Sequence, residues 1–392
     1  MFGYGPTMKA ATQNLYDKID AAMAEHPQAD TITVGELFAE FLTHKRTVKG
    51  NKAKTIFNDM KDYRLHIGPA IGEKPIASVT LADLQVLQYG LVKQGKYRTA
   101  ELVTISVKSF YTYAMKYYRD EIESGQLRLR NVAADLDPIR RPPSLKPKPV
   151  LWSMDQLQAF LALAKSRYDN NRRILMYPLF YTALSAGLRR GELLGLKLDG
   201  LVTRSIRGRP AYLLRITEQL VHYDKKHHPD TPKTEMGVRD VPIDASLAAV
   251  LNAHILKLEE IARANPDWQD HGLMFPSYNG TPLEPSNIYR SRDEIIEKLG
   301  LPHSTLHQMR KVYGSYVTRN MIRSGTFSPK KLQGLLGHSS PDTAIKIYTQ
   351  IIEEDTEGMT FDPLEAPAGM SAGMTPEIKP KEEDGEDEDS PS

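Results

Sequence analysis

Residues 127–150 form a basic stretch broken by prolines, and this stretch constrains the fold of the chain more than any other. Proline removes a backbone donor and clashes with the preceding turn, so the stretch cannot form a helix. The regions before and after it both place apolar residues at helical spacing. With 392 residues, the chain is long enough for about two domains plus extensions. We therefore predict a linker at 127–150 between two domains; an exposed loop with no connecting role is the simpler alternative.

The region before the linker predicts a small helical domain over residues 32–126. Thr80 has the character of an N-cap that opens a helix, and the last helix of the domain is rich in aromatic residues. Residues 1–31 are predicted to be an N-terminal extension with a short amphipathic helix. The expected helices of the domain cover 34–42, 53–67, a segment that starts after Thr80, and 99–118.

The region after the linker predicts a second domain over residues 151–357. An apolar helix is expected over 174–188, with Gly187 as its stop signal. Alternation of apolar residues predicts strands at 211–216 and 238–243. The fold class is therefore mainly α with a small β-sheet. Further helices are expected to start at Ser153 and to cover 245–265, 291–299, 305–323, 329–336 and 341–354.

Charge is divided unevenly along the chain. Lys and Arg number 51 and Asp and Glu 49, which gives a net charge of +2. Residues 353–392, however, contain 14 acidic and two basic residues, whereas the rest of the chain contains 49 basic and 35 acidic ones. A basic body favours a polyanionic partner. Residues 358–392, rich in Pro, Gly, Glu and Asp, are predicted to be a disordered acidic tail.

Several classes of function are excluded by what the sequence lacks. Without cysteine, the chain has no disulfides, thiolate metal sites or thiol nucleophiles, which fits a reducing cytosol. The first six residues do not resemble a signal peptide, and the most apolar stretch, 175–188, is too short to span a bilayer. No G-x-x-x-x-G-K-[ST] phosphate loop occurs, so nothing indicates nucleotide hydrolysis. We expect a cytoplasmic protein with no membrane partner.

Histidines gather at one place in the sequence, where His222, His227 and His228 flank Lys225 and Lys226. Imidazoles at such spacing can hold a metal ion. A solvated or phosphate-facing loop is the simpler interpretation, and we therefore predict no metal site here.

The first of four candidate functional segments follows the apolar helix. Gly187 ends that helix and the next helix begins at once, so Arg189 lies beside free backbone N–H groups. An arginine at a helix N-terminus can hold a phosphate through two hydrogen bonds. Glu192, three residues on, can orient the guanidinium. For this segment alone, a solvated helix start is the simpler alternative.

Two further segments supply a lysine and a His/Arg pair. Lys233 is expected in a hairpin tip before the second predicted strand, where it could protonate a substrate oxygen; alone it would read as a solvated lysine. Ser304 is a credible N-cap for the next helix. His307 and Arg310 lie three residues apart and share one face of that helix, an arrangement suited to a developing negative charge. A surface His/Arg pair is the alternative.

The fourth segment contains Gly337, His338 and Tyr348. Gly337 is expected to cap one helix, and Ser340-Pro341 to open the next. Tyr348 then falls two turns into that next helix. A tyrosine at the edge of the core is the simpler alternative for this position.

In their order and spacing, the four segments resemble the tyrosine recombinase (lambda-integrase-type, phage integrase) family. Its catalytic domain carries G-L-R-x-x-E-L, a lysine in a P-K-T hairpin, H-x-x-R, and L-G-H followed nine or ten residues later by a tyrosine. Residues 187–193 match the first motif in full, and Lys233 lies in the sequence P-K-T. His307 and the arginine three residues later match H-x-x-R, and His338 and Tyr348 are ten residues apart.

The resemblance covers roughly residues 32–352. It implies a helical core-type DNA-binding domain over 32–126 and an α+β catalytic domain over 151–357, with the basic linker between them. One departure is Lys311, where many members have a second histidine directly after the arginine. That position usually supports structure, so we expect activity to be kept and the pKa values nearby to change.

The chemistry implied by the resemblance is DNA strand cleavage and rejoining without ATP, a metal or another cofactor. Tyr348 would attack a phosphodiester, form a 3′-phosphotyrosyl intermediate and free a 5′-hydroxyl. Lys233 would protonate the leaving oxygen. The non-bridging phosphate oxygens would be held by Arg189, Arg310, His307 and His338, with Glu192 behind the arginines.

The resemblance also implies the partners. Double-stranded DNA would be clamped between the two domains, and a homotetramer on paired sites would exchange strands through a Holliday junction. DNA-bending accessory proteins are a further class of partner, and the protein would be associated with the nucleoid through DNA. Two alternatives stay open: a type IB topoisomerase-like enzyme that relaxes DNA, and a non-catalytic DNA-binding accessory factor.

Overall fold

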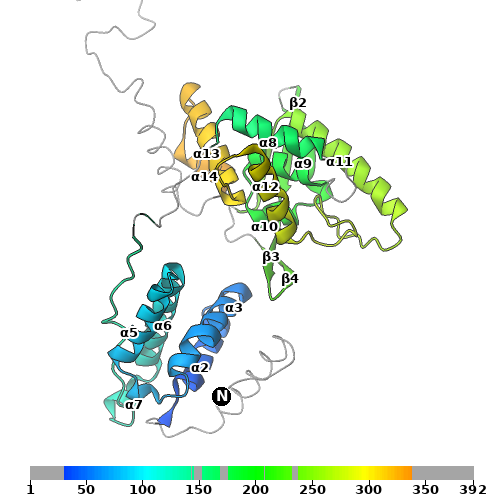
Figure 1. Ribbon diagram of the computed structural model, residues 1–392. Coiled ribbons are helices and arrows are strands. Elements are labelled where there is room, and N and C mark those ends of the chain that lie inside the picture. Colours follow the sequence, from blue (N-terminus) through cyan, green and yellow to red (C-terminus); the bar gives the residue numbers. More distant parts are fainter. Residues whose placement is uncertain are drawn as a thin grey trace, which may run out of the picture.

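The computed structural model describes residues 31–142, 144, 152–167, 175–206, 208–231 and 237–337. In this part of the chain two large hydrophobic cores form, one between Ile32 and Leu136 and one between Trp152 and Val312, beside smaller clusters. Figure 1 shows the helices around the first core in blue to cyan and the elements around the second in green to orange. The expected amphipathic helix before residue 31, the helix over 341–354 and the acidic tail lie outside the described residues.

Helices surround the first core, and their starts follow local capping rules. The hydroxyls of Thr33 and Thr80 each accept a hydrogen bond from the backbone three residues on, and Glu36 and Asp83 accept one in return. This reciprocal pattern satisfies two free donors at a helix start, and it confirms the predicted N-cap at Thr80. The elements are α2 (Val34–Thr47), α3 (Ala53–Asp62), a π-helical turn (Tyr63–Ile67), α4 (Gly68–Ile71), a short 3₁₀ turn (Ile76–Ser78), α5 (Leu81–Lys93), α6 (Tyr97–Tyr117) and α7 (Arg119–Glu123).

Aromatic rings fill the centre of the first core. Phe38, Phe41 and Phe110 are fully buried, and the centroids of their rings lie 5.1–5.8 Å apart, a separation at which tilted aromatic pairs attract. Leu129 and Leu136 are buried in the same core. The first part of the expected 127–150 linker is therefore packed against the N-terminal helices instead of crossing freely.

Helix α9 passes through the second core and is buried along most of its length. Ser153 caps α8 as predicted, because its hydroxyl accepts from the backbone N–H of Gln156. Helix α12 begins earlier than expected, since Pro285 provides the first helical position. The helices are α8 (Met154–Ser166), α9 (Met176–Ala186), α10 (Arg190–Gly195), a 3₁₀ turn (Leu198–Gly200), α11 (Ala245–Ala264), α12 (Pro285–Leu299), α13 (Leu306–Arg323) and α14 (Pro329–Leu336).

Two small antiparallel sheets accompany these helices. The three-stranded sheet has the order β1 (Leu201–Ile206), β2 (Arg209–Ile216), β5 (Arg239–Ile243), and Leu214 of β2 pairs with Val241 of β5. Both predicted strands, 211–216 and 238–243, thus lie in this sheet. The second sheet is a hairpin of β3 (Gln219–Tyr223) and β4 (Lys226–Asp230).

The β3–β4 hairpin corrects one sequence-based interpretation. The histidine stretch that we interpreted as a loop forms paired strands, with His222 directly opposite His227. A two-residue turn, Asp224-Lys225, joins them with positive φ at both residues, the backbone form that matches strand twist in tight hairpins. Lys233, predicted to lie in a hairpin tip before the second strand, is outside the described residues.

The two cores meet where α3 approaches the β3–β4 hairpin (Figure 1). Lys52 Nζ lies 2.9 and 3.0 Å from the carboxylate oxygens of Asp230 and donates to the carbonyl of Thr231 at 2.7 Å. The rings of Phe57 and Tyr223 lie 5.4 Å apart at their centroids. Among the described helices, none is long and apolar enough to cross a membrane.

Candidate active site

Arg189 is positioned by a sharp turn between α9 and α10. Gly187 ends α9 in the left-handed conformation at φ +58°, and Arg189 is already the N-cap of α10. A side chain at Gly187 would place its Cβ 2.2 Å from the ring of Tyr313. Both the backbone conformation and the close approach therefore require glycine here.

Glu192 is the buried centre around which three arginines gather. Its side chain is 1% exposed, and Oε1 accepts from Arg189 Nη1 at 2.7 Å while Oε2 accepts from the backbone N–H of Arg189 at 2.8 Å. Arg239 contacts both carboxylate oxygens, at 3.1 and 3.0 Å, and Arg310 Nη1 lies 3.8 Å from Oε2. Burial acts to raise the pKa of Glu192, but the hydrogen bond and charge of Arg239, together with Arg189, lower that pKa to about 2. The carboxylate therefore stays ionised and pairs with the arginines.

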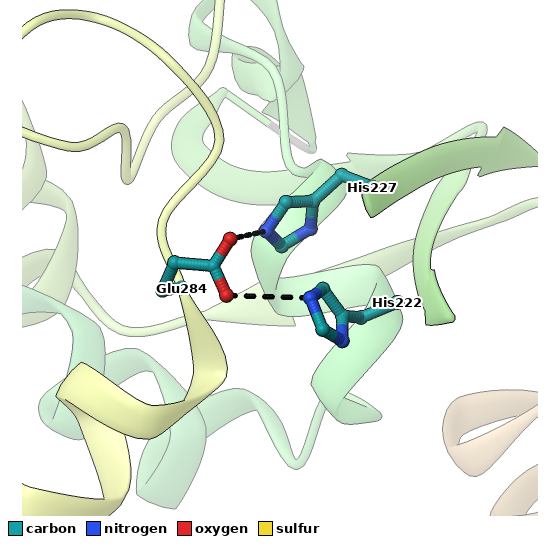
Figure 2. A group of neighbouring side chains, drawn as sticks. All are labelled: His222, His227 and Glu284. Atoms are coloured by element: carbon teal, nitrogen blue, oxygen red, sulfur yellow. Dashed lines mark ion pairs between the residues drawn. The ribbon is translucent and has the colours of Figure 1, made fainter. Parts of the chain in front are cut away.

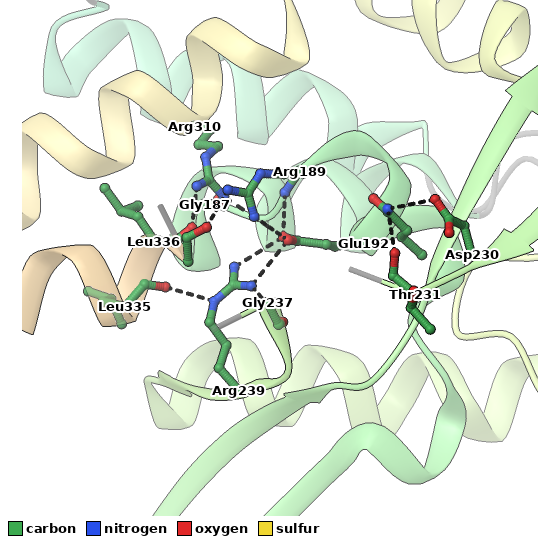
Figure 3. Close-up of polar contacts among 12 residues, drawn as sticks. Gly187, Arg189, Glu192, Asp230, Thr231, Gly237, Arg239, Arg310, Leu335 and Leu336 are labelled. Carbon is green, nitrogen blue, oxygen red and sulfur yellow. Dashed lines mark hydrogen bonds and ion pairs between the residues drawn. The ribbon is translucent and has the colours of Figure 1, made fainter. Parts of the chain in front are cut away.

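The end of α14 completes this cluster through its backbone (Figure 3). The carbonyls of three consecutive residues each accept from a different arginine: Leu335 from Arg239 Nε at 3.0 Å, Leu336 from Arg310 and Gly337 from Arg189. Carbonyls at a helix C-terminus carry partial negative charge and attract cations. The cluster therefore fixes the chain up to the residue that precedes His338.

His307 and Arg310 lie on the first turns of α13, as their spacing predicts. The N-cap of this helix is Thr305 and not the predicted Ser304, because the Thr305 hydroxyl accepts from the backbone of Gln308. Burial and the nearby positive charges, led by Lys311, lower the pKa of His307, so its imidazole is neutral at neutral pH. Arg310 is 4% exposed and donates to the carbonyl of Gly187 at 2.8 Å. Burial and the neighbouring Arg189 lower its pKa to about 10, which still leaves it charged.

A groove of about 680 Å³ opens over this cluster and extends to α3. His307 lies in its wall, and Asp230 is the one carboxylate among its lining residues in the described part of the chain. Such a preponderance of cations suits a polyanionic ligand. The lining cations come from both cores: Lys52, Lys54, Arg189, Arg190, Arg292 and Arg310.

Three predicted site residues, Lys233, His338 and Tyr348, lie outside the described residues. The described chain next to two of them is held by the arginine cluster. Gly237, at one border of the Lys233 segment, accepts from Arg239 Nη1 at 3.1 Å, and Gly337 accepts from Arg189. The described residue after the Lys233 segment and the described residue before His338 therefore both contact this cluster.

A model of the phage integrase family matches residues 152–354, which is more than half of the chain. The chain belongs to the phage integrase family. The matched region includes every catalytic-motif residue named above, among them those that the structure gathers around Glu192.

Two curated relatives of this phage integrase family member match about half of it. A tyrosine recombinase XerC-like protein of Caldanaerobacter subterraneus subsp. tengcongensis is 29% identical over 184 residues, 44% of this chain and 45% of that protein. The integrase of Staphylococcus phage L54a is 26% identical over 191 residues, 47% of this chain and 52% of that protein. The chain thus spans about half the length of the curated relatives it matches.

Solved integrase structures share the fold over most of the chain. The Tn1549 transposon integrase in complex with a circular intermediate DNA superposes with a TM-score of 0.62 at 20% identity, covering 81% of this chain and 95% of that one. A lambda integrase dimer bound to a core site gives a TM-score of 0.55 at 16% identity, covering 85% and 99%. These likenesses confirm the predicted fold class, mainly α with small sheets.

Arg239 is the site residue that sequence reasoning missed. It was visible in the run Arg239-Asp240-Val241-Pro242, but the alternating pattern of that run indicated only a strand. In the structure, Arg239 stands out because its side chain is charged yet only 7% exposed, on a strand. Its partner Glu192 lies 47 residues away in the sequence, so the pair becomes visible only in the fold.

Proposed function

We propose that this protein is a site-specific DNA recombinase that cleaves and rejoins strands through a 3′-phosphotyrosyl intermediate on Tyr348. The observation that carries the proposal is the arginine cluster around Glu192, which holds the chain one residue before His338 and eleven before Tyr348. Fixed cations at that place suit a phosphate that gains charge in the transition state.

The proposed first step exchanges one phosphoester for another. The phenolic oxygen of Tyr348 forms a bond to phosphorus, and the bond from phosphorus to the 5′-oxygen breaks. Lys233 gives its proton to that leaving oxygen. In the second step a 5′-hydroxyl attacks the phosphotyrosyl phosphorus and releases the tyrosine, so the energy of the phosphodiester is kept without ATP.

The arginines and histidines are proposed to stabilise charge without a metal or another cofactor. Arg189, with 37% of its side chain exposed, is the more accessible of the two proposed phosphate-binding arginines, whereas Arg310 is buried and donates to backbone carbonyls. Neutral His307 can donate one hydrogen bond to a non-bridging oxygen, and His338 is proposed to donate another. Because Glu192 and α14 hold the guanidinium groups in place, little reorganisation is needed when charge develops.

Double-stranded DNA is the proposed partner, held between a core-type DNA-binding domain (32–126) and a catalytic domain (151–357). The groove between α3 and α13 supports this, because both domains contribute its cations. The assignment of 127–150 as the linker, of 1–31 as an extension and of 358–392 as an acidic tail belongs to the same proposal. Contacts of lysine and arginine to phosphates would make binding strongly salt-dependent.

For assembly we propose a homotetramer on paired sites that resolves a Holliday junction, with DNA-bending proteins as accessory factors. A structure of a lambda integrase tetramer bound to a Holliday junction shares the fold, with a TM-score of 0.53 at 17% identity over 93% of this chain and 92% of that one. The protein would work in the cytoplasm, associated with the nucleoid.

Covalent trapping tests the proposal. DNA from the neighbourhood of the gene, nicked near candidate cleavage points so that the cleaved end diffuses away, is incubated with wild type, Tyr348→Phe and the control Tyr278→Phe. We expect adducts from wild type and from the control, whose tyrosine is exposed in a loop and does not line the groove, and none from Tyr348→Phe. An adduct of wild-type yield from Tyr348→Phe would reject the assignment.

The same experiment separates the alternatives. DNA binding without any adduct from wild type would favour a non-catalytic accessory factor. Relaxation of supercoiled plasmid by a monomer, without sequence preference, would favour a type IB topoisomerase-like enzyme.

A further inference from the structure

The β3–β4 hairpin brings two histidines and a distant glutamate together outside the arginine cluster (Figure 2). His222 and His227 face each other across the hairpin and share one of its faces. Glu284, the residue directly before α12, places its carboxylate between them. Its Oε2 lies 3.3 Å from His222 Nε2 and its Oε1 lies 3.2 Å from His227 Nε2.

These separations are those of ligands around one small metal ion. Zinc binds imidazole nitrogen at about 2.0–2.1 Å and carboxylate oxygen at about 2.0–2.2 Å, so tetrahedral ligands lie about 3.3–3.5 Å apart. The three candidate ligand atoms of the cluster all lie within 4.8 Å of one another. A small closure of the hairpin onto Glu284 would bring them into a common coordination sphere.

The polar atoms of the cluster have unused bonding capacity. Nε2 of both His222 and His227 is buried without a hydrogen-bond partner in the described part of the chain, and so is Nδ1 of His227. The two histidine nitrogens thus lie close to the Glu284 carboxylate, but the angles at these contacts are not those of hydrogen bonds.

We propose that His222, His227 and Glu284 form a zinc site that fastens the β3–β4 hairpin to the start of α12. Two imidazoles and one carboxylate are a ligand set that zinc uses in proteins, whereas magnesium and calcium take oxygen ligands. Glu284 is 48% exposed, so solvent reaches the site and water can complete the coordination. This site is separate from the proposed recombinase chemistry, which needs no metal.

The β3–β4 hairpin carries the proposed zinc site on one face and contacts the N-terminal helices with the other. Side chains on a strand alternate between faces, and Tyr223 and Asp230 lie on the face opposite the two histidines. That opposite face contacts α3 through Phe57 and Lys52. A metal bound by the two histidines would therefore hold the β3–β4 hairpin in place, and this hairpin is where the second core contacts the N-terminal helices.

Metal binding to the full-length protein tests the inference. Protein freed of metal with a chelator is titrated with Zn²⁺ alone, and the bound metal is counted by mass spectrometry of the desalted sample. Co²⁺ serves as a spectroscopic probe, because tetrahedral coordination gives visible absorption. We expect one ion per chain in a high-affinity site, and a melting temperature that rises with Zn²⁺ and falls again with chelator.

Substitutions locate the site. Glu284→Gln keeps the shape of an exposed side chain, and His227→Gln removes a ligand; both should weaken binding by at least the roughly 10–100-fold that loss of a supporting partner costs at metal sites. His228→Gln is the matched control, because that ring stacks on Tyr223 at 3.9 Å on the other face and should bind Zn²⁺ as wild type does. Circular dichroism confirms that the variants are folded.

Three outcomes would overturn the inference. The first is wild type that fails to retain one Zn²⁺ per chain. The second is folded Glu284→Gln that binds Zn²⁺ with wild-type affinity and stoichiometry. The third is His228→Gln that loses binding as fully as His227→Gln does. None of these outcomes bears on adduct formation by Tyr348, so the proposed recombinase function is judged separately.

Discussion

Arg239 and Glu192 form a buried ion pair with two parallel contacts, from Nη1 to Oε1 at 3.1 Å and from Nη2 to Oε2 at 3.0 Å. The pair joins strand β5 to helix α10, and both side chains are almost fully buried, at 7% and 1% exposed. The pair connects the three-stranded sheet to the arginine cluster. Because Arg189 contacts the same Glu192 carboxylate, Arg239 also helps to hold Arg189 in position.

Arg239→Ala should destabilise the fold strongly. The substitution removes the main partner of a buried carboxylate, and breaking such a pair costs about 3–5 kcal/mol. Arg215→Ala is the matched control: Arg215 contacts Asp240 on the neighbouring strand at 3.3 Å but is 44% exposed, so its loss should cost less than about 1 kcal/mol. Urea unfolding measures both, and equal losses would show that Arg239 does not stabilise Glu192.

The ionisation of Glu192 predicts how stability depends on pH. Its pKa lies at about 2 in the folded protein, below its ordinary value of 4.5. Because the unfolded chain takes up the proton first as pH falls, this contribution is complete above about pH 4.5 and is lost as the pH falls toward about 2. Glu192→Gln lacks it, so the gap in unfolding free energy between wild type and variant should narrow by on the order of 3 kcal/mol over that range. Denaturant titrations at several pH values measure the gap, and a constant gap would contradict the assignment.

Gly337→Ala should damage both stability and cleavage. Gly337 has φ +61°, and a Cβ there would lie 2.8 Å from Arg239 Nη1 and 3.3 Å from Arg189 Nη1. Gly325→Ala is the matched control, because Gly325 has φ +64° at the end of α13 and a Cβ added there would meet nothing within 4 Å. Both variants should lose about 1–2 kcal/mol from backbone strain, but only Gly337→Ala should lose more and fail in covalent trapping. Wild-type adduct yield from Gly337→Ala would show that the cluster tolerates displacement.

The contact between Lys52 and Asp230 should be exchanged for contacts with DNA. Both side chains are partly exposed, at 38% and 27%, so the pair itself is weak. Asp230→Asn removes the carboxylate of the groove and should tighten DNA binding about fivefold, whereas Lys52→Ala should weaken it and reduce the salt slope by about one. Fluorescence anisotropy across salt concentrations measures both. Asp267→Asn, which loses the same charge on an exposed loop outside the groove, should change neither quantity.

Lys233→Ala should slow cleavage of ordinary DNA by roughly 10²–10⁴-fold, the usual contribution of a general acid. A 5′-phosphorothiolate substrate has a sulfur leaving group that departs without a proton, so the variant should cleave that substrate at close to the wild-type rate. Comparing adduct formation on the two substrates measures the rescue, and failure of rescue would argue against Lys233 as the acid.

Features set by local interactions were predictable from the sequence. Thr80 and Ser153 cap their helices because each hydroxyl needs only the backbone three residues on, and Gly187 stops α9 because its own conformation requires it. The predicted N-cap of α13, Ser304, was wrong by one residue, because the hydroxyl of the next residue, Thr305, caps the helix.

Features set by partners far along the chain were not predictable. The β3–β4 strands lack a clear apolar alternation, and Pro229 within β4 favours a loop. Arg239 is recognisable only beside Glu192, and the histidine cluster only beside Glu284, 57 residues after His227. The motifs did identify Arg189, Glu192, His307 and Arg310, which the structure brings to one groove and its buried floor.

The three carbonyls at the end of α14 make the length of that helix critical. One residue inserted between Pro329 and Leu335 would advance the helix end by about 1.5 Å and turn it by about 100°. All three arginine contacts, from Arg189, Arg239 and Arg310, would be lost together. Residues 269–271, in the loop after α11, are exposed and should accept an insertion more readily. Length variants at these two places should therefore differ in stability and in adduct formation.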